Sequence, residues 1–253
     1  MAAGDTRDRA ETIVRASAEF QEFLGELQVD DLLQLVDLEL GSLDEFVPRG
    51  DIRSKAVAPG TILHVVSGNS PHAGLQTLVR GVLLGSRNLV KLPSGSGAEI
   101  RAFAEAMPFG IEISDELLDG WLEEAEVVVV FGSDETIDYF RDQLRPDQIF
   151  VPHGHRVSFS VVLDGDDREA AVAAARDVSL FDQQGCLSPH CIYVGGNARA
   201  FARQLAEEMA TFDAKQPRRN LSIGEAAELM HLRNGYEFRA ASDPRKGGRP
   251  AGM

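Results

Sequence analysis

Long hydrophobic runs, basic charge and secretion signals are scarce in this sequence, and each shortage excludes a class of protein. Its 253 residues carry 40 acidic and 25 basic side chains, a net charge of −15, which repels phosphate backbones and anionic lipid. No apolar run approaches the roughly 18–20 residues of a membrane-spanning helix. The N-terminal MAAGDTRDRAETIV lacks the apolar segment of a secretory signal. We therefore expect a cytoplasmic protein with no nucleic-acid partner and no membrane span.

Cysteine is also scarce, which excludes a disulfide framework. Cys186 and Cys191 are the only two, and a reducing compartment is the default for such a chain. Together with His153, His155 and His190 they could form a metal site. The C-x₄-C and H-x-H spacings, however, fit no common structural zinc site. We expect no metal, and a Cys/His metal-binding protein is kept as an alternative.

The apolar residues that are present, 43% of the chain, are enough for a packed core and follow two periods. Residues 1–50 show apolar positions at helical spacing, typical of amphipathic helices. From residue 61, short apolar strands alternate with helices, which indicates βαβ units and a parallel sheet. Strands are expected over 61–66, 88–91, 111–113, 127–131, 148–151, 157–163 and 191–194. Helices are expected over 76–84, 98–106, 117–124, 134–144, 168–180, 201–211 and 223–232, with a basic Gly/Pro tail from residue 239.

Ligands of such sheets bind beyond the carboxyl ends of the strands, so the loops after residues 66, 92 and 131 are candidate site segments. Asn69 offers an amide donor of the kind found in oxyanion holes, although it also suits a turn. Lys91, before a Gly/Ser-rich loop, could reach a phosphate or ribose hydroxyl, or simply extend to solvent. Gly132 and Ser133 open a helix after a buried strand, which suits either a phosphate or a capped turn.

Cys186 is the candidate nucleophile. It follows a glycine in the polar loop FDQQGCLSPH, which is not the pattern of a core cysteine, and a thiolate needs little activation near neutral pH. Cys191, at the start of an expected strand, is expected to be a small buried hydrophobe.

Four blocks at these positions resemble the LuxC-type acyl-CoA reductases of the aldehyde dehydrogenase superfamily. They are ILHVVSGNSPHAGLQTLVRGVLLGSRNLVKLPS, VVVVFGSDETI, VPHGHRVSFSVV and FDQQGCLSPH, and the resemblance covers roughly residues 60–240. It implies an α/β fold of aldehyde-dehydrogenase type, with a Rossmann-like cofactor domain and part of an α/β catalytic domain. It also implies NADPH-dependent reduction of a fatty acyl-CoA, or another acyl thioester, to the aldehyde.

The resemblance also assigns roles to the candidate residues. Cys186 matches the nucleophile that carries the acyl group as a thioester. Asn69 matches the oxyanion-stabilising asparagine, helped by the backbone N–H of Cys186. Lys91 and Ser94 match the stretch that holds the adenosine ribose. The turn of residues 132–133 matches the one near the cofactor pyrophosphate, which implies cofactor contacts from Gly132 and Ser133.

One block departs from the superfamily in a way that makes chemical sense. Hydrolytic aldehyde dehydrogenases carry a general-base glutamate in a Glu-Leu-Gly-Gly block, where this sequence has Pro152, His153, Gly154 and His155. An enzyme that exchanges acyl groups with a thiol has no need to activate water. We expect His153 or His155 to shuttle a proton to the coenzyme A thiolate, although imidazoles also cap loops.

The resemblance suggests a domain division. We expect an N-terminal helical region over 1–60, a Rossmann-like NADP-binding domain over 61–155, a partial catalytic domain over 156–240 and a disordered tail over 241–253. Superfamily members continue well beyond the nucleophile, so a C-terminally truncated chain is expected, and a non-catalytic nucleotide-binding remnant is the alternative function. Besides acyl-CoA, the partners that fit are a second copy or an acyl-transferring enzyme.

Overall fold

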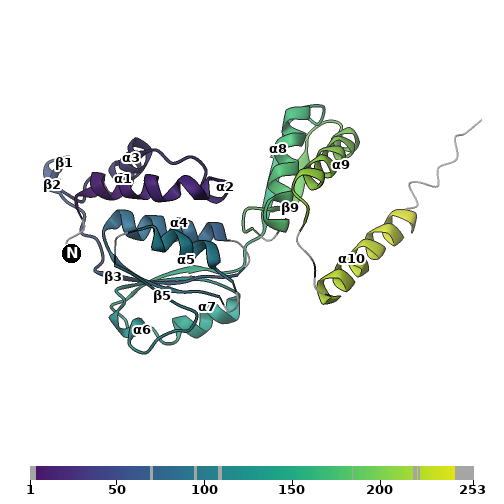
Figure 1. Cartoon of the computed structure of the whole chain (residues 1–253). Coiled ribbons are helices and arrows are strands. Elements are labelled where there is room, and N and C mark those ends of the chain that lie inside the picture. Colours follow the sequence, from purple (N-terminus) through teal and green to yellow (C-terminus); the bar gives the residue numbers. More distant parts are fainter. Residues whose placement is uncertain are drawn as a thin grey trace, which may run out of the picture. The chain divides into compact units, whose positions relative to one another are not determined.

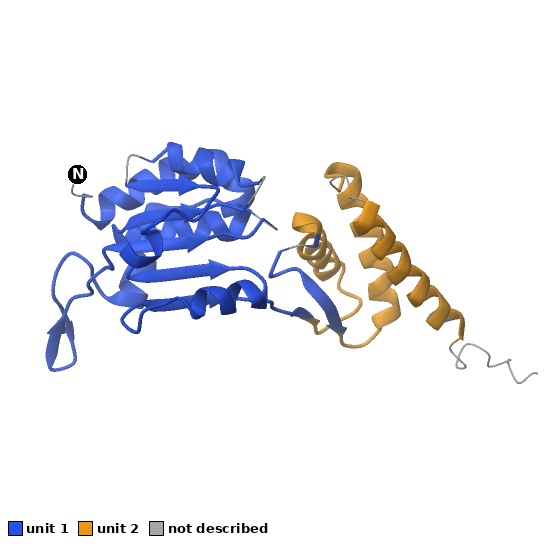
Figure 2. Ribbon diagram, turned by 90° about the horizontal axis from the view of Figure 1, so that it is seen from below, with its two compact units in different colours: residues 1–160, 183–193 blue, residues 161–182, 194–253 orange. Residues whose placement is uncertain are grey.

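The computed structural model describes residues 4–68, 71–93, 96–107, 110–183, 185–218, 221 and 223–242. The chain divides into two compact units (Figure 2). Unit 1 comprises Met1–Ser160 and Gln183–Tyr193, and unit 2 comprises Val161–Asp182 and Val194–Met253. The division therefore falls at other positions than those expected from the sequence.

Unit 1 is built around a five-stranded parallel sheet. Its strands are β3 (Thr61–Val65), β4 (Arg87–Lys91), β5 (Ile111–Ser114), β6 (Val127–Phe131) and β7 (Ile149–His153). The spatial order is β5-β4-β3-β6-β7. The chain thus moves outward from β3 to one edge and then returns to β6. In open α/β sheets, ligands bind at the carboxyl edge where this reversal occurs, here between β3 and β6.

Helices cover both faces of this sheet (Figure 1). Helices α4 (Pro71–Leu84) and α5 (Ala98–Glu105) lie on one face, and α6 (Trp121–Glu124) and α7 (Asp134–Arg141) lie on the other. Each face has its own hydrophobic cluster. Because the sheet is covered twice, the central strands β3 and β6 are mostly apolar, and the VVVVF of β6 is apolar at every position.

The N-terminal helices belong to the same core as the sheet. They are α1 (Thr6–Ser17), a short 3₁₀ turn η1 (Ala18–Phe20), α2 (Gln21–Leu24) and α3 (Val29–Leu40). Phe20 meets the fully buried Phe103 of α5 edge to face, with ring centroids 5.2 Å apart. Arg9 Nε donates to the Leu83 carbonyl of α4 at 2.9 Å. The amphipathic stripes of this segment therefore pack against the rest of the fold.

Helix α4 approaches the sheet closely over a buried polar network. A Cβ atom placed on Gly81 would lie 1.9 Å from Asn88 Oδ1, so only glycine allows this separation. Beneath it, His64 is 1% exposed. Its Nε2 donates to Asn88 Oδ1 at 3.0 Å, while Thr77 Oγ1 donates to its Nδ1 at 2.9 Å. The Asn88 amide is oriented by donating to the Ser86 carbonyl, which sets this tautomer. The network fills the helix–sheet interface with satisfied polar groups.

Unit 2 contains three helices among its described residues. Helices α8 (Arg168–Ser179) and α9 (Ala198–Lys215) pack together, and α10 runs over Ile223–Ser242. Strands β8 (Ser158–Val162) and β9 (Pro189–Val194) pair as a two-stranded ribbon, and the boundary between the units falls within both strands.

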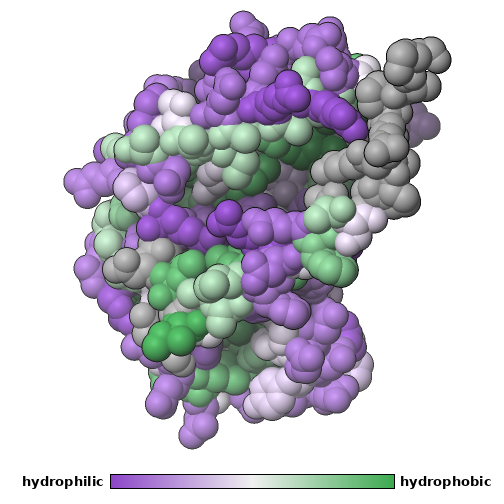
Figure 3. All heavy atoms as spheres, turned by 90° about the vertical axis from the view of Figure 1, so that its right-hand side faces the viewer, coloured by the Kyte–Doolittle hydropathy of each residue, from purple (hydrophilic) through white to green (hydrophobic). Residues whose placement is uncertain are grey.

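Several apolar side chains reach the surface. Val157, Phe159 and Val161 are each at least 60% exposed at alternating positions around β8. On the face drawn in Figure 3, hydrophobic residues gather in patches separated by hydrophilic ones. Within the described residues, no helix combines the length and the apolar character needed to cross a membrane.

Several elements differ from those that the sequence predicts. A hairpin of β1 (Val47–Arg49) and β2 (Ile52–Ser54), which the sequence did not predict, follows α3. The helix expected over 117–124 is limited to the short α6. Helix α10 continues past the expected end at residue 232, so residues 239–242 of the expected tail are helical. Residues 243–253 lie outside the described residues.

Candidate functional site

The loops that follow β3 and β4 meet at the carboxyl edge of the sheet. A Cβ placed on Gly68 would lie 3.0 Å from Ser96 Oγ and 3.4 Å from Pro93 Cβ. The sequence-predicted Asn69 and Ser94 belong to these two loops but lie outside the described residues. Their neighbours show that the loops expected to hold the oxyanion donor and the ribose lie against one another.

Lys91 ends β4 at this edge. It pairs in register with Val65 of β3 and Ser114 of β5, and its side chain is half-buried. Among the described residues, its ammonium group has no hydrogen-bond or ion-pair partner. A half-buried cation without a protein partner, at the ligand-binding edge, is available to a phosphate or a ribose hydroxyl.

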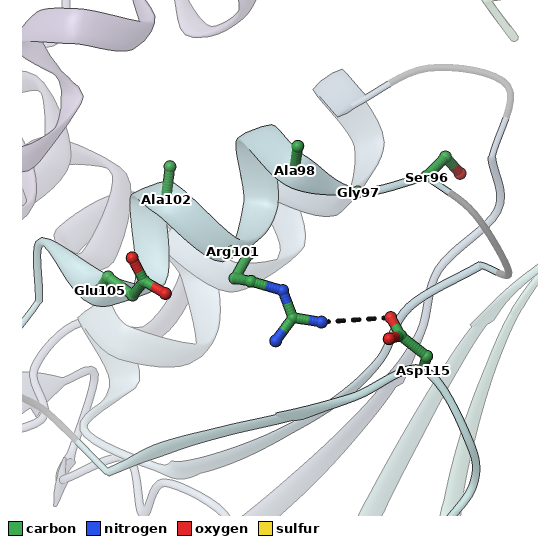
Figure 4. A pocket seen from close by; sticks show the side chains of 7 residues that line it. All are labelled: Ser96, Gly97, Ala98, Arg101, Ala102, Glu105 and Asp115. Atoms are coloured by element: carbon green, nitrogen blue, oxygen red, sulfur yellow. Dashed lines mark hydrogen bonds and ion pairs between the residues drawn. The ribbon is translucent and has the colours of Figure 1, made fainter.

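A pocket of about 380 Å³ lies beside the first turns of α5 (Figure 4). It is lined by Ser96, Gly97, Ala98, Arg101, Ala102, Glu105 and Asp115. The helix begins at Gly97, whose φ of +100° is left-handed, and no described side chain caps its first N–H groups. Arg101 Nη2 donates to Asp115 Oδ1 at 3.1 Å across the pocket. This pocket is adjacent to the loop after β4.

The sequence singled out the loop but missed Arg101 and Asp115. A signal was present, because Arg101 lies in the first turn of the expected helix and Asp115 lies two residues beyond the expected strand over 111–113. Neither position matches a motif. Only the adjacency of β4 and β5 in the sheet places them on one pocket.

The turn after β6 is a capped helix start. Ser133 accepts from the Thr136 N–H at 3.4 Å, and a Cβ on Gly132 would lie 2.9 Å from Thr136 Cβ. The Ser133 hydroxyl and the backbone N–H of Glu135 lower the pKa of the Glu135 carboxyl. The side chain of Ser133 therefore serves the cap, and the absence of a side chain at Gly132 leaves room for Thr136.

The two histidines of the Pro-His-Gly-His block lie beside this turn. His153 ends β7 and stacks on Phe131, with ring centroids 4.4 Å apart and planes 11° from parallel. Burial lowers the pKa of His153, and the charges of Arg156 and Arg80 lower it further, which favours the neutral imidazole near pH 7. The backbone N–H of His155 donates to Asp134 Oδ1 at 3.3 Å, and the residue is exposed.

Cys186 is exposed and held by its backbone on two sides. The Ser188 N–H donates to the Gly185 carbonyl at 3.0 Å, closing a turn around Cys186. The Ser158 hydroxyl donates to the Cys186 carbonyl at 2.5 Å. The thiol is therefore accessible on an anchored backbone, as a nucleophile requires.

A run of left-handed backbone precedes this turn. Phe181, Asp182 and Gln183 have φ values of 57°, 55° and 66°, a conformation costly for residues with a side chain. Strained backbone of this kind is concentrated at functional sites.

Cys191 is exposed, whereas the sequence predicts a buried residue. It is exposed within β9, and the prediction of a buried residue was wrong, because a two-stranded ribbon leaves strand side chains uncovered. Within the part of the chain that the structure describes, no group of three or more His, Cys, Asp or Glu residues could hold a metal ion. The five residues of the alternative metal site thus do not form one.

Comparisons with known proteins agree with this architecture. Residues 10–108 and 106–245 match the sequence model of the family described as Acyl-CoA reductase (LuxC). A long-chain acyl-protein thioester reductase from Aliivibrio fischeri is 29% identical over 234 residues, which are 82% of this chain and 49% of that protein. One of the same description from Vibrio harveyi is 27% identical over 229 residues, 82% of this chain and 48% of that protein. The chain thus spans about half the length of the curated relatives it matches.

Solved structures show the same fold. An NAD-dependent benzaldehyde dehydrogenase from Corynebacterium glutamicum superposes with a TM-score of 0.55 at 19% identity, covering 82% of this chain and 54% of that one. An aldehyde dehydrogenase from Bacillus cereus, solved with NAD+, superposes with a TM-score of 0.55 at 16% identity, covering 81% and 50%. The fold is therefore that of the aldehyde dehydrogenases, as expected from the sequence.

Proposed function

Because the chain belongs to the LuxC family of acyl-CoA reductases, we propose that it reduces a fatty acyl thioester to the aldehyde with NADPH. The curated relatives are named for long-chain acyl groups carried by a protein, so coenzyme A and a protein thiol are both acyl donors of the right chemistry. The observation that carries the proposal is Cys186, an exposed thiol on an anchored turn in the same compact unit as the cofactor-type sheet.

The reaction begins with acyl transfer. The Cys186 thiolate attacks the carbonyl carbon of the donor thioester, a new acyl–Sγ bond forms, and the bond to the donor sulfur breaks. The amide of Asn69 and the backbone N–H of Cys186 stabilise the oxyanion. His153 or His155 gives a proton to the departing thiolate. The lowered pKa of His153 keeps its imidazole mostly neutral near pH 7, so as a shuttle it would first take up a proton and then give it to the departing thiolate.

The carboxyl edge of the sheet suits a nicotinamide dinucleotide. Lys91 and Ser94 would hold the adenosine ribose, next to the pocket beside α5. Gly132 and Ser133 would hold the pyrophosphate, as the resemblance implies, through backbone groups, because the Ser133 hydroxyl already serves the helix cap. NADPH, when bound, supplies the hydride that reduces the enzyme thioester. Cys186 then leaves as a thiolate and the aldehyde is released.

Acyl labelling tests the nucleophile. The full chain is incubated with a long-chain acyl-CoA, and its intact mass is measured. We expect one acyl adduct, absent from Cys186→Ser and retained by Cys191→Ser, which is the matched control because both thiols are exposed. NADPH affinity is expected to be nearly equal in all three proteins.

Two results would contradict the assignment. An adduct retained by Cys186→Ser would place the nucleophile elsewhere. NADPH binding without any adduct on the folded wild-type chain would favour the nucleotide-binding alternative, in which no acyl transfer occurs.

A further inference from the structure

Arg101 and Asp115 form an incomplete ion pair across the pocket beside α5 (Figure 4). The single contact joins Arg101 Nη2 and Asp115 Oδ1 at 3.1 Å. Within the described ranges, the guanidinium has no other partner, so most of its five N–H groups remain available to a ligand. Both side chains are about half exposed, at 42% and 62%. Because solvent screens such a pair, breaking it costs little free energy, and Arg101 can exchange the Asp115 carboxylate for an anion of higher charge.

The position of Arg101 and Asp115 relative to Lys91 indicates which anionic group of a ligand would reach Arg101. Lys91 on β4 is paired in register with Ser114 on β5, and Asp115 follows Ser114 directly. A ribose held at Lys91 therefore lies next to the pocket. The Ser96 hydroxyl and the uncapped first turn of α5 line the same pocket and add hydrogen-bond donors.

We propose that Arg101 is the residue by which this protein selects NADPH over NADH, by binding the 2′-phosphate of the adenosine ribose, and that Asp115 tunes this selection. The proposal rests on the proposed function, in which the ribose is held at this edge. A guanidinium binds a phosphate through paired N–H···O bonds, and an arginine beside the ribose is a known solution for the 2′-phosphate in related nucleotide folds. Asp115 positions Arg101 when the phosphate is absent and repels the phosphate when it is present. A cofactor with a free 2′-hydroxyl gains nothing from Arg101.

Two nucleotide fragments separate the 2′-phosphate from the rest of the cofactor. Binding of 2′,5′-ADP and of 5′-AMP to the full chain is measured by calorimetry at fixed low salt. We expect 2′,5′-ADP to bind more tightly. Arg101→Gln should weaken 2′,5′-ADP by roughly tenfold or more while leaving 5′-AMP unchanged. Asp115→Asn should strengthen 2′,5′-ADP several-fold. Arg141→Gln, which removes an exposed arginine paired with Asp138 on α7, is the matched control and should change neither affinity.

The possible failures are distinguishable. If Arg101→Gln weakens both fragments equally, or leaves the preference for 2′,5′-ADP intact, Arg101 does not select the phosphate and the proposal is overturned. If neither fragment binds the folded wild-type chain, the adenosine site of the proposed function is itself wrong. Circular dichroism of each variant establishes that it is folded.

Discussion

Cys186 and Cys191 are both exposed, so their surroundings rather than their accessibility distinguish them. Cys186 lies in a turn closed by Gly185 and Ser188, whereas Cys191 lies within a strand. In the sequence, the glycine and the polar loop made Cys186 a candidate nucleophile, and the family resemblance assigned it that role. The exposure of Cys191 could not be predicted, because it depends on how many strands join β9. Arg101 and Asp115 were missed for a similar reason, since their proximity arises from strand order.

His64 should make folding stability depend on pH. Burial lowers its pKa from 6.5 to about 4, and the hydrogen bond to Asn88 offsets only part of this. Between pH 6.5 and about pH 4, His64 binds a proton in the unfolded chain but not in the folded chain. The contribution of His64 to stability is therefore complete above pH 6.5 and is lost as the pH falls toward 4. The difference of about 2.5 pKa units corresponds to roughly 3 kcal/mol.

Urea unfolding followed by Trp121 fluorescence measures this effect. Trp121 is the only tryptophan and is buried in the sheet unit. We expect the wild-type free energy of unfolding to fall between pH 6.5 and 4.5, and His64→Gln to show a shallower slope. His155→Gln, at an exposed histidine of the same unit, should retain the wild-type slope. Equal slopes in the wild type and His64→Gln would show that His64 does not titrate in this way.

At the scale of elements, the alternation of apolar strands and helices was sufficient to predict the sheet. The strand over 127–131 has the predicted bounds, and the ends of the other sheet strands lie within two residues of the predicted ends. Polar strands were harder, and the hairpin of Val47–Arg49 and Ile52–Ser54 was missed because it has no buried apolar residue to mark it. The close contact of α4 with the sheet could not be predicted from the sequence either, because a glycine within a helix, such as Gly81, does not indicate which residue packs against it.

Gly81 provides a test of that contact. Gly81→Ala places a methyl group 1.9 Å from Asn88 Oδ1, so α4 must shift or the network around His64 must break. We expect a loss of about 3 kcal/mol of stability, measured by urea unfolding. Gly235→Ala in α10 is the matched control, because no atom lies within 4 Å of the new Cβ. It should be neutral or slightly stabilising, since alanine is the better helix former. Comparable losses in both variants would argue against the close packing of α4.

At the scale of the whole molecule, the candidate residues with described positions all belong to unit 1. This unit contains Cys186, both histidines of the Pro-His-Gly-His block and the cofactor-type edge of the sheet. In a chain with a net charge of −15, Lys91 and Arg101 are the cations at the edge where an anionic cofactor is proposed to bind, and Glu105 and Asp115 line the same pocket. The proposed chemistry thus depends on one unit that provides both a nucleophile and a nucleotide site.

The most direct test of this account is a single-turnover experiment on the acylated chain. The protein is first acylated with a long-chain acyl-CoA and freed of excess donor, NADPH is then added, and the aldehyde is extracted and quantified by gas chromatography coupled to mass spectrometry. The account predicts that the adduct disappears from the intact mass only when NADPH is added and that one equivalent of aldehyde forms for each NADPH oxidised. An adduct that persists with NADPH bound, or that is released as the carboxylic acid, would contradict it.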